Sequence, residues 1–246
     1  EDPDGLAVVL LRAFGVLLEE PGTEGVVDPA CPDIVFAEGL RDEAERPFET
    51  VSRAGLKLKA ALDHFGIDPT GLTCLDLGAS TGGFTDLLVR RGALLVHAVD
   101  VGHGQLHASL LGHPRIVNHE GLDARKVDEA HVPGTIDLVV ADLSFIGLVK
   151  AIPAGLARLK PGGRLIALIK PQFEAGPNAG KRGIIRDEAV HAEIVARVTA
   201  EVAALGIDAI ETMPSPIEGG DGNREFLLTG RKRSVDREPL PERTTP

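Results

Sequence analysis

The chain has 246 residues, of which 43% are hydrophobic and 26% charged, a balance that is ordinary for one globular domain with a short additional segment. No apolar run approaches the roughly 20 residues that a membrane-spanning helix needs. Cys31 and Cys74 form no CxxC spacing, so we expect neither a disulfide framework nor a metal site. These features predict a cytoplasmic protein without membrane contact.

The net charge of −11 is concentrated at one end of the chain. Residues 1–50 contain thirteen acidic and three basic residues, so they carry ten of the eleven excess negative charges. Such a segment would repel phosphate groups. Trp and Tyr are absent, which leaves Phe, apart from His, as the residue able to stack on a base.

The predicted elements begin with a short apolar helix over 6–18 and an irregular stretch up to residue 50. Ser52 is predicted as the N-cap of a helix that ends at Gly66. Further helices are predicted over 82–91, 147–159 and 187–205. Apolar strands alternate with them and are predicted at 73–78, 94–100, 115–118, 136–142 and 164–171. A last antiparallel pair is predicted at 207–213 and 224–230.

This alternation predicts an α/β, Rossmann-like fold, with a seven-stranded, mostly parallel sheet and helices on both faces. Residues 51–230 would form this domain. Residues 1–50 would be an appended acidic segment, and residues 231–246 a disordered tail rich in Pro and charge.

A glycine-rich loop follows the first predicted strand of this domain and opens a helix. It reads DLGASTGGFT over 76–85 and departs from the GxGxxG spacing of pyrophosphate-binding loops. Asp76 would suit a cationic amino-acid group, Asp100 a ribose diol and Asp123 an adenine amine. An ordinary glycine-rich turn with incidental acids is the alternative. The predicted cofactor contacts are Asp76, Gly78, Ala79, Ser80, Thr81, Gly82, Gly83, Phe84, Asp100, Val101, Asp123 and Asp142.

Four charged residues stand where charge is conspicuous: Lys57, Asp142, Lys170 and Glu225. Asp142 and Lys170 end apolar strands, and ligands bind at the carboxyl ends of strands in open α/β sheets. A partly desolvated lysine near a second lysine has a lowered pKa, whereas carboxylates that hold it in place act in the opposite direction. A neutral Lys170 could take a proton from a hydroxyl that attacks an electrophilic methyl group. The alternative is that each residue is a solvated charge at the end of an element.

Six segments carry a family resemblance. They read VSRAGLKL at 51–58, DLGASTGGFTD at 76–86, AVDVG at 98–102, VADLSF at 140–145, IKPQFE at 169–174 and GNREF at 222–226. Together they resemble the TlyA (hemolysin A) branch of the FtsJ-type ribosomal RNA 2′-O-methyltransferases. The resemblance implies a class I S-adenosylmethionine-binding fold, with S-adenosylhomocysteine as the product. It also implies that the family's Lys-Asp-Lys-Glu tetrad maps onto the four charged residues above, with Lys170 at its centre.

Departures from the family shape the expected substrate. The basic RNA-binding module that precedes the family's catalytic domain is replaced by the acidic segment 1–50. His103 and Ala108 stand where the family has aromatic residues, and 120–123 lacks a base. The loop 175–186 keeps Lys181, Arg182 and Arg186, and is interpreted as a mobile lid or, equally, as a solvated connection.

Because RNA affinity depends largely on neutralising phosphates, the preferred hypothesis is methyl transfer to a hydroxyl of a small molecule, in natural-product tailoring. The main alternative is ribose 2′-O-methylation of ribosomal RNA. A third hypothesis is non-methylating chemistry, such as dehydration or cyclisation, with the cofactor bound. A pore-forming or purely binding protein is disfavoured. A small-molecule partner is thus expected ahead of RNA, and a homo-oligomer is left open.

Overall fold

The computed structural model describes residues 26–27, 35–36, 50–175 and 184–234. The chain divides into two compact units, Glu1–Phe48 and Glu49–Pro246. In the first unit, the described residues form an antiparallel pair of short strands, β1 (Val26–Val27) and β2 (Val35–Phe36). The predicted helix over 6–18 lies outside the described residues.

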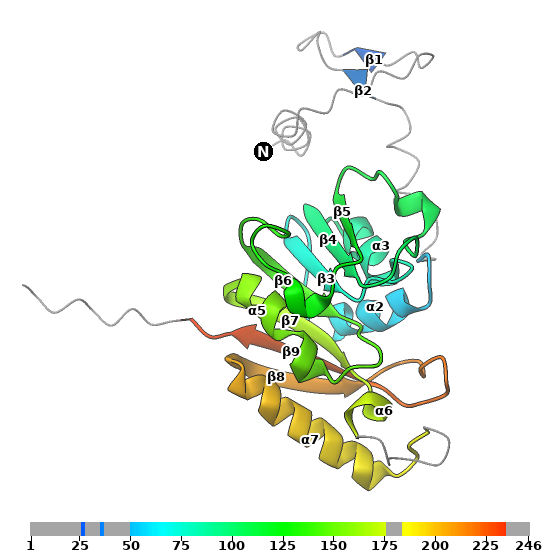
Figure 1. The fold of residues 1–246 in the computed structure, drawn as a ribbon, viewed down its shortest axis with the longest axis vertical. Helices are drawn as coiled ribbons and strands as arrows, with labels where there is room; N and C mark the ends of the chain where they lie inside the picture. The colour runs from blue at the N-terminus through cyan, green and yellow to red at the C-terminus, as the bar shows by residue number, and fades with distance from the viewer. Residues whose placement is uncertain (1–25, 28–34, 37–49, 176–183, 235–246) are drawn as a thin grey trace, which may run out of the picture. The chain divides into compact units, whose positions relative to one another are not determined.

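The second unit is built on a seven-stranded sheet with the order β5-β4-β3-β6-β7-β9-β8 (Figure 1). Five strands are parallel: β3 (Thr73–Leu77), β4 (Leu95–Asp100), β5 (Ile116–Glu120), β6 (Ile136–Ala141) and β7 (Leu159–Ile169). The last two are β8 (Ile207–Pro214) and β9 (Phe226–Lys232), of which β9 pairs antiparallel with both β7 and β8, and β8 forms the edge. The predicted Rossmann-like α/β sheet is therefore confirmed.

Helices cover both faces of this sheet, because successive strand side chains point to opposite faces. On one face, α2 (Ala54–His64) and α3 (Gly83–Arg90) share a hydrophobic cluster with Cys74. On the other, α4 (Leu148–Ala151), α5 (Pro153–Arg158) and α7 (Glu188–Ala204) share a cluster with Leu75. Three short elements complete the unit: η3 (Ala108–Leu110), η4 (Ala124–Lys126) and α6 (Pro171–Glu174).

Several predicted boundaries were wrong for local reasons. Arg53, not Ser52, is the N-cap of α2, since the Ser52 carbonyl accepts hydrogen bonds from Thr50 Oγ1 and the Gly55 amide. The helix predicted over 147–159 is two helices, because Pro153 has no N–H to continue α4 and starts α5 instead.

Strand β9 runs two residues into the predicted tail, which begins at residue 231. Lys232 secures this end, because its Nζ donates to the carbonyl oxygens of Leu156 and Leu159, at 2.6 Å each. In the described part of the chain, no helix combines the length and the apolar character that crossing a membrane requires. The carboxyl ends of β3, β4, β6 and β7 meet at one edge of the sheet, where the candidate site lies.

Candidate active site

The glycine-rich loop after β3 takes a conformation that few other sequences allow. Gly78, Ser80 and Gly82 all have positive φ angles, of 84°, 48° and 92°. A Cβ atom on Gly78 would lie 2.6 Å from the backbone oxygen of Asp142, so glycine is required there for close approach as well as for φ. The loop therefore lies directly against the end of β6, which carries one of the predicted catalytic residues.

Asp76 lies beneath this loop as a buried carboxylate with unused hydrogen-bonding capacity. Its Oδ2 accepts a hydrogen bond from Thr85 Oγ1 at 2.7 Å, while its Oδ1 has no partner among the described residues. Burial raises the pKa of Asp76 to about 7, against the opposing effect of the Thr85 hydrogen bond. A cationic group brought close to this carboxylate would be stabilised by it.

Asp100, at the end of β4, is arranged to bind two hydroxyl groups. Its Oδ2 accepts from the Ser80 amide at 2.8 Å and its Oδ1 from the Gly102 amide at 2.7 Å. Each carboxylate oxygen has two acceptor positions, so one remains on each oxygen. The neighbouring Val101 is largely exposed and offers an apolar surface beside them. This set of groups fits a ribose diol next to a flat aromatic ring.

Two of the predicted cofactor contacts, Gly83 and Phe84, are buried against the core, and their contact with a cofactor stays a prediction. Phe84 is buried in the cluster between α2, α3 and the sheet. A Cβ atom on Gly83 would lie 3.1 Å from the Gly55 amide nitrogen, so Gly83 allows α3 to pack closely against α2. The sequence places both residues next to the loop, but the first turn of α3 directs them inward.

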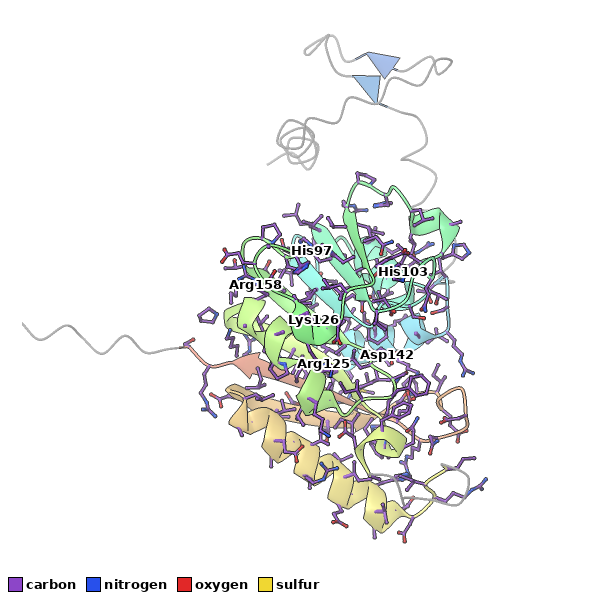
Figure 2. All side chains as sticks on the ribbon, viewed as in Figure 1. His97, His103, Arg125, Lys126, Asp142 and Arg158 are labelled. Carbon is purple, nitrogen blue, oxygen red and sulfur yellow. The ribbon has the colours of Figure 1, made fainter. Side chains whose placement is uncertain are left out.

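Asp123 is engaged by a neighbouring arginine. Its two oxygens accept hydrogen bonds from Arg125 Nε at 2.9 and 3.1 Å, and from Arg125 Nη2 at 2.5 Å. These bonds lower the pKa of Asp123 to about 2. Figure 2 labels Arg125, whose side chain is exposed, together with Asp142. Contact between Asp123 and an adenine amine stays a prediction, and in this structure the carboxylate positions Arg125.

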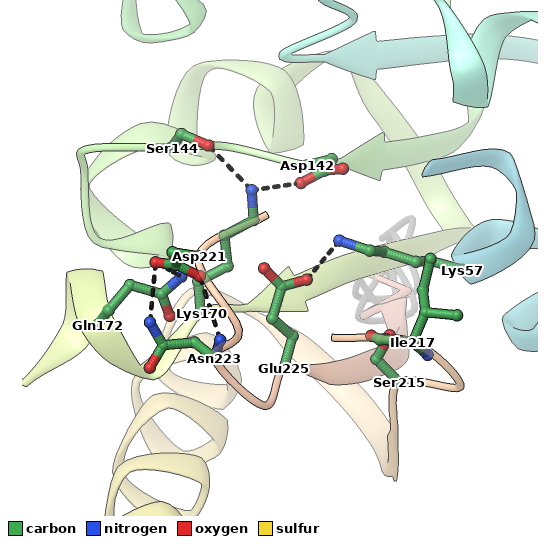
Figure 3. Close-up of polar contacts among 10 residues, drawn as sticks. All are labelled: Lys57, Asp142, Ser144, Lys170, Gln172, Ser215, Ile217, Asp221, Asn223 and Glu225. Carbon is green, nitrogen blue, oxygen red and sulfur yellow. Dashed lines mark hydrogen bonds and ion pairs between the residues drawn. The ribbon is translucent and has the colours of Figure 1, made fainter. Parts of the chain in front are cut away.

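The four conspicuous charges form two adjacent ion pairs (Figure 3). Lys170 Nζ lies 2.6 Å from Asp142 Oδ1, and Lys57 Nζ lies 2.5 Å from Glu225 Oε2. Lys57, Lys170 and Glu225 are buried, so they are not solvated charges at the ends of elements. The two pairs link α2, the ends of β6 and β7, and the segment just before β9. Lys57 and Glu225 are 168 residues apart in the sequence.

Three supporting residues were missed by the sequence reasoning. Ser144 Oγ accepts a hydrogen bond from Lys170 Nζ at 2.9 Å. Asn223 is fully buried and accepts from the Ile185 amide at 3.0 Å, which fixes the chain just before Glu225. A Cβ atom on Gly219 would lie 2.6 Å from Glu225 Oε1. Ser144 and Asn223 stand inside recognised motifs, which was the available signal, whereas Gly219 had none.

Phe145 projects from the loop after β6. Its φ angle is 66°, a strained backbone conformation for a residue other than glycine, and its side chain is 91% exposed. Its ring centroid lies 5.2 Å from that of Phe173. The end of this loop is held by Glu174, whose Oε1 accepts from the Leu148 amide at 2.6 Å. The exposed ring of Phe145 therefore directly follows Ser144, whose hydroxyl group contacts Lys170.

The predicted lid is only partly described. Lys181 and Arg182 lie outside the described residues, and Arg186 lies within them. Whether 175–186 acts as a lid therefore stays a prediction.

A family model described as FtsJ-like methyltransferase matches residues 50–232. The chain belongs to the FtsJ-like methyltransferase family. The match covers the whole sheet and all four paired charges, and it confirms that the protein is a methyltransferase-type enzyme.

Individual relatives agree with this assignment. The 16S/23S rRNA (cytidine-2′-O)-methyltransferase TlyA of Mycobacterium tuberculosis is 43% identical over 179 residues, which cover 72% of this chain and 67% of that protein. A solved structure of a candidate hemolysin from Lactococcus lactis has a TM-score of 0.72 and 41% identity, and covers 76% of this chain and 90% of that one. An S-adenosylmethionine-dependent O-methyltransferase from Thermotoga maritima, 15% identical with a TM-score of 0.51, covers 80% of this chain and 71% of that one, and shares the class I fold.

These findings correct the expected partner. The small-molecule acceptor in natural-product tailoring was wrong as the preferred hypothesis, because the matched relative is by name a ribosomal RNA methyltransferase. The error came from reading the acidic segment 1–50 and the missing aromatic and basic residues as evidence against an RNA substrate. The excess acid lies in residues 1–50, whereas the family match begins at residue 50. RNA binding depends on local basic groups and not on the total charge.

Proposed function

We propose that this protein is an S-adenosylmethionine-dependent methyltransferase that acts on a ribose 2′-hydroxyl of ribosomal RNA. The observation that carries the proposal is the pair of buried Lys–carboxylate contacts packed against a glycine-rich cofactor loop. The names of the relatives at about 40% identity support the RNA substrate.

The cofactor site fits the proposed ligand. Asp76 would attract its amino group, Asp100 would accept hydrogen bonds from its ribose diol, and Val101 would contact its adenine ring. Gly78 and Gly82 would let the loop backbone approach it closely. When bound, S-adenosylmethionine supplies an electrophilic methyl group on a sulfonium centre.

Lys170 is proposed as the proton acceptor. In its neutral form, Nζ has two N–H groups and one lone pair. Ser144 Oγ takes up one N–H group at 2.9 Å, Asp142 Oδ1 lies 2.6 Å from Nζ as its charge partner, and the lone pair is left for the ribose hydroxyl. When the hydroxyl oxygen bonds to the methyl carbon, the sulfur–methyl bond would break to leave S-adenosylhomocysteine, and the hydroxyl proton would move to Lys170 Nζ. The resulting ammonium is stabilised by Asp142.

The second pair is proposed to position the ribose. Glu225 takes up one N–H of Lys57 at 2.5 Å, so the remaining N–H groups of Lys57 can donate to ribose oxygens. Buried groups in this arrangement hold the acceptor in line with the methyl group, and such positioning supplies much of the rate.

Phe145 is proposed to stack on the target base. An exposed ring next to a catalytic pair is a surface on which an unstacked base can lie, and base–aromatic stacking contributes about 1–3 kcal/mol. The guanidinium of Arg53 lies near Gly220, in the segment that leads to Glu225, where it can meet a phosphate.

The test is transfer of a labelled methyl group from S-adenosylmethionine to ribosomal subunits that lack 2′-O-methylation. We expect label in ribosomal RNA at a dinucleotide that resists alkaline cleavage, because a 2′-O-methyl group removes the hydroxyl that attacks the phosphate. Label in protein or in small molecules alone, with unlabelled RNA, would refute the proposal. The Lys170→Ala protein is the matched inactive control.

A further inference from the structure

A groove outside the cofactor site lies between α7 and the β8–β9 edge of the sheet. Its volume is about 550 Å³, within the range of about 300–1,000 Å³ that is usual for ligand sites. Small residues of α7, Ala192 and Ala196, form one wall, and Met213 and Phe226 contribute to the opposite side. Neither the cofactor loop nor the two ion pairs lines it.

His191 is the unusual feature of this groove. It is only 5% exposed, and neither of its ring nitrogens has a hydrogen-bond partner among the described residues. A buried polar group without a partner costs about 1–3 kcal/mol, and such groups are rare in folded proteins. A neutral imidazole has one donor and one acceptor nitrogen. The groove therefore suits a ligand with hydrogen-bonding groups on a largely flat, apolar body.

The rest of the groove points to an aromatic ligand with an anionic group. Phe226 meets the His191 ring at a centroid distance of 5.6 Å, and the Arg224 guanidinium lies 5.5 Å from the Phe226 centroid. Arg224 is half-exposed at the rim, where it faces Glu188 at 3.3 Å, a pair that solvent screens. Phe226 and the two alanines offer apolar surface to a flat ring, and Arg224 offers a cation to a charged substituent.

The groove and the ion pairs lie on either side of one short stretch of chain. Arg224 and Phe226 line the groove, while Glu225 between them binds Lys57. Adjacent residues of an extended segment point to opposite faces. The groove therefore begins within one residue of Glu225, and a nucleotide next to the one at the ion pairs is the part of an RNA substrate nearest to it.

We propose that this groove binds the base of a second ribonucleotide, one that flanks the methylated nucleotide, with His191 hydrogen-bonding the base and Arg224 meeting its phosphate. This inference rests on the proposed RNA methylation and adds a subsite to it. The subsite binds a part of the substrate that does not react, so it contributes to substrate affinity and not to the chemical step.

The variant that tests it is Ala192→Leu, which fills the groove and leaves His191 and Arg224 in place. Ala200→Leu is the matched control, because Ala200 is exposed on the same helix and does not line the groove. We expect Ala192→Leu to raise KM for ribosomal subunits about tenfold with kcat unchanged, and Ala200→Leu to change neither. An unaltered KM in Ala192→Leu overturns the proposal.

A second measurement does not depend on methylation. The ring resonances of His191, assigned by their loss in His191→Gln, should shift on addition of AMP, GMP, CMP or UMP to the unmodified protein, and should not shift in Ala192→Leu. If none of the four nucleotides shifts the His191 resonances, the proposed base-binding role of the groove is overturned. Failure of the proposed function gives a different result, because ribosomal RNA then stays unlabelled while the His191 resonances still shift on addition of nucleotide.

Discussion

Gly78 contacts Asp142 so closely that the glycine-rich loop and the Lys170–Asp142 pair form one unit. A Cβ atom at residue 78 would lie 2.6 Å from the Asp142 backbone oxygen, and the Asp142 amide donates to Leu77 at 3.0 Å. Displacement of the loop by even a methyl group would therefore move the residue that holds Lys170.

Gly78→Ala should impair both stability and cofactor binding. Its φ of 84° costs alanine about 1–2 kcal/mol, and the contact with Asp142 adds to this. Gly66→Ala is a matched control, since Gly66 has a φ of 61° with nothing within 4 Å of its Cβ position. Urea denaturation should show a loss in both variants, and calorimetry should show weaker S-adenosylmethionine binding only in Gly78→Ala. Equal cofactor affinities in the two variants would contradict the close approach.

Cofactor affinity should rise with pH up to about 7 because of Asp76. Its folded-state pKa is raised to about 7, so below that pH most molecules hold a neutral carboxyl group that binds a cation poorly. Affinity should fall by up to about tenfold per pH unit below the pKa. Titration calorimetry between about pH 5.5 and 7.5 tests this, and the dependence should flatten in Asp76→Asn.

The same shift makes a prediction for the stability of the protein without cofactor. Because the folded-state pKa lies above the ordinary value of 3.8, the neutral carboxyl form favours folding. The Asp76 contribution should therefore be lost as pH rises from about 4 to about 7. A pH-independent difference in unfolding free energy between the original protein and Asp76→Asn would refute it.

Lys170→Ala should lower kcat about 10²–10⁴-fold with little change in cofactor affinity, because the residue acts on the acceptor hydroxyl. Lys160→Ala is the control: Lys160 lies near the start of β7, the strand that Lys170 follows, is half-exposed, and pairs with Asp137 at 2.5 Å. Single-turnover methylation of ribosomal subunits gives the comparison. Normal turnover in Lys170→Ala would remove Lys170 from the mechanism.

The Lys57–Glu225 pair should be far more sensitive than an exposed pair. Lys57→Met leaves Glu225 buried without its partner and should cost about 3–5 kcal/mol of unfolding free energy. Lys59→Met breaks the exposed Lys59–Asp63 pair and should cost less than about 1 kcal/mol. In the double variant Lys57→Met/Glu225→Gln, the unfolding free energy should largely return, because neither residue 57 nor residue 225 then carries a buried charge. Methylation activity should not return.

Phe145→Gly should separate substrate binding from stability. Glycine relieves the strain of the 66° φ angle, so unfolding free energy should stay equal or rise by up to about 1 kcal/mol. Loss of the exposed ring should raise KM for ribosomal subunits about tenfold. Phe145→Tyr keeps the ring and should retain the original KM. An unchanged KM in Phe145→Gly would exclude stacking at this residue.

Individual residues show which features of this protein its sequence predicts and which depend on the folded chain. Apolar runs and their spacing determined the strands and the mostly parallel sheet, because backbone periodicity and turn chemistry are local properties. The motifs likewise determined which lysines and carboxylates to examine. They did not show that Asp123 holds Arg125 or that Phe84 lies in the core, because both depend on which way a turn directs a side chain.

The pairing of the four charges depends on the tertiary structure. Lys57 and Glu225 are 168 positions apart, and their 2.5 Å contact depends on the packing of α2 and on β9 lying beside β7. The groove beside His191 and the exposure of Phe145 arise in the same way, from packing between distant segments. Sequence patterns report the character of each segment, whereas such contacts exist only once the chain has folded and buried its apolar faces.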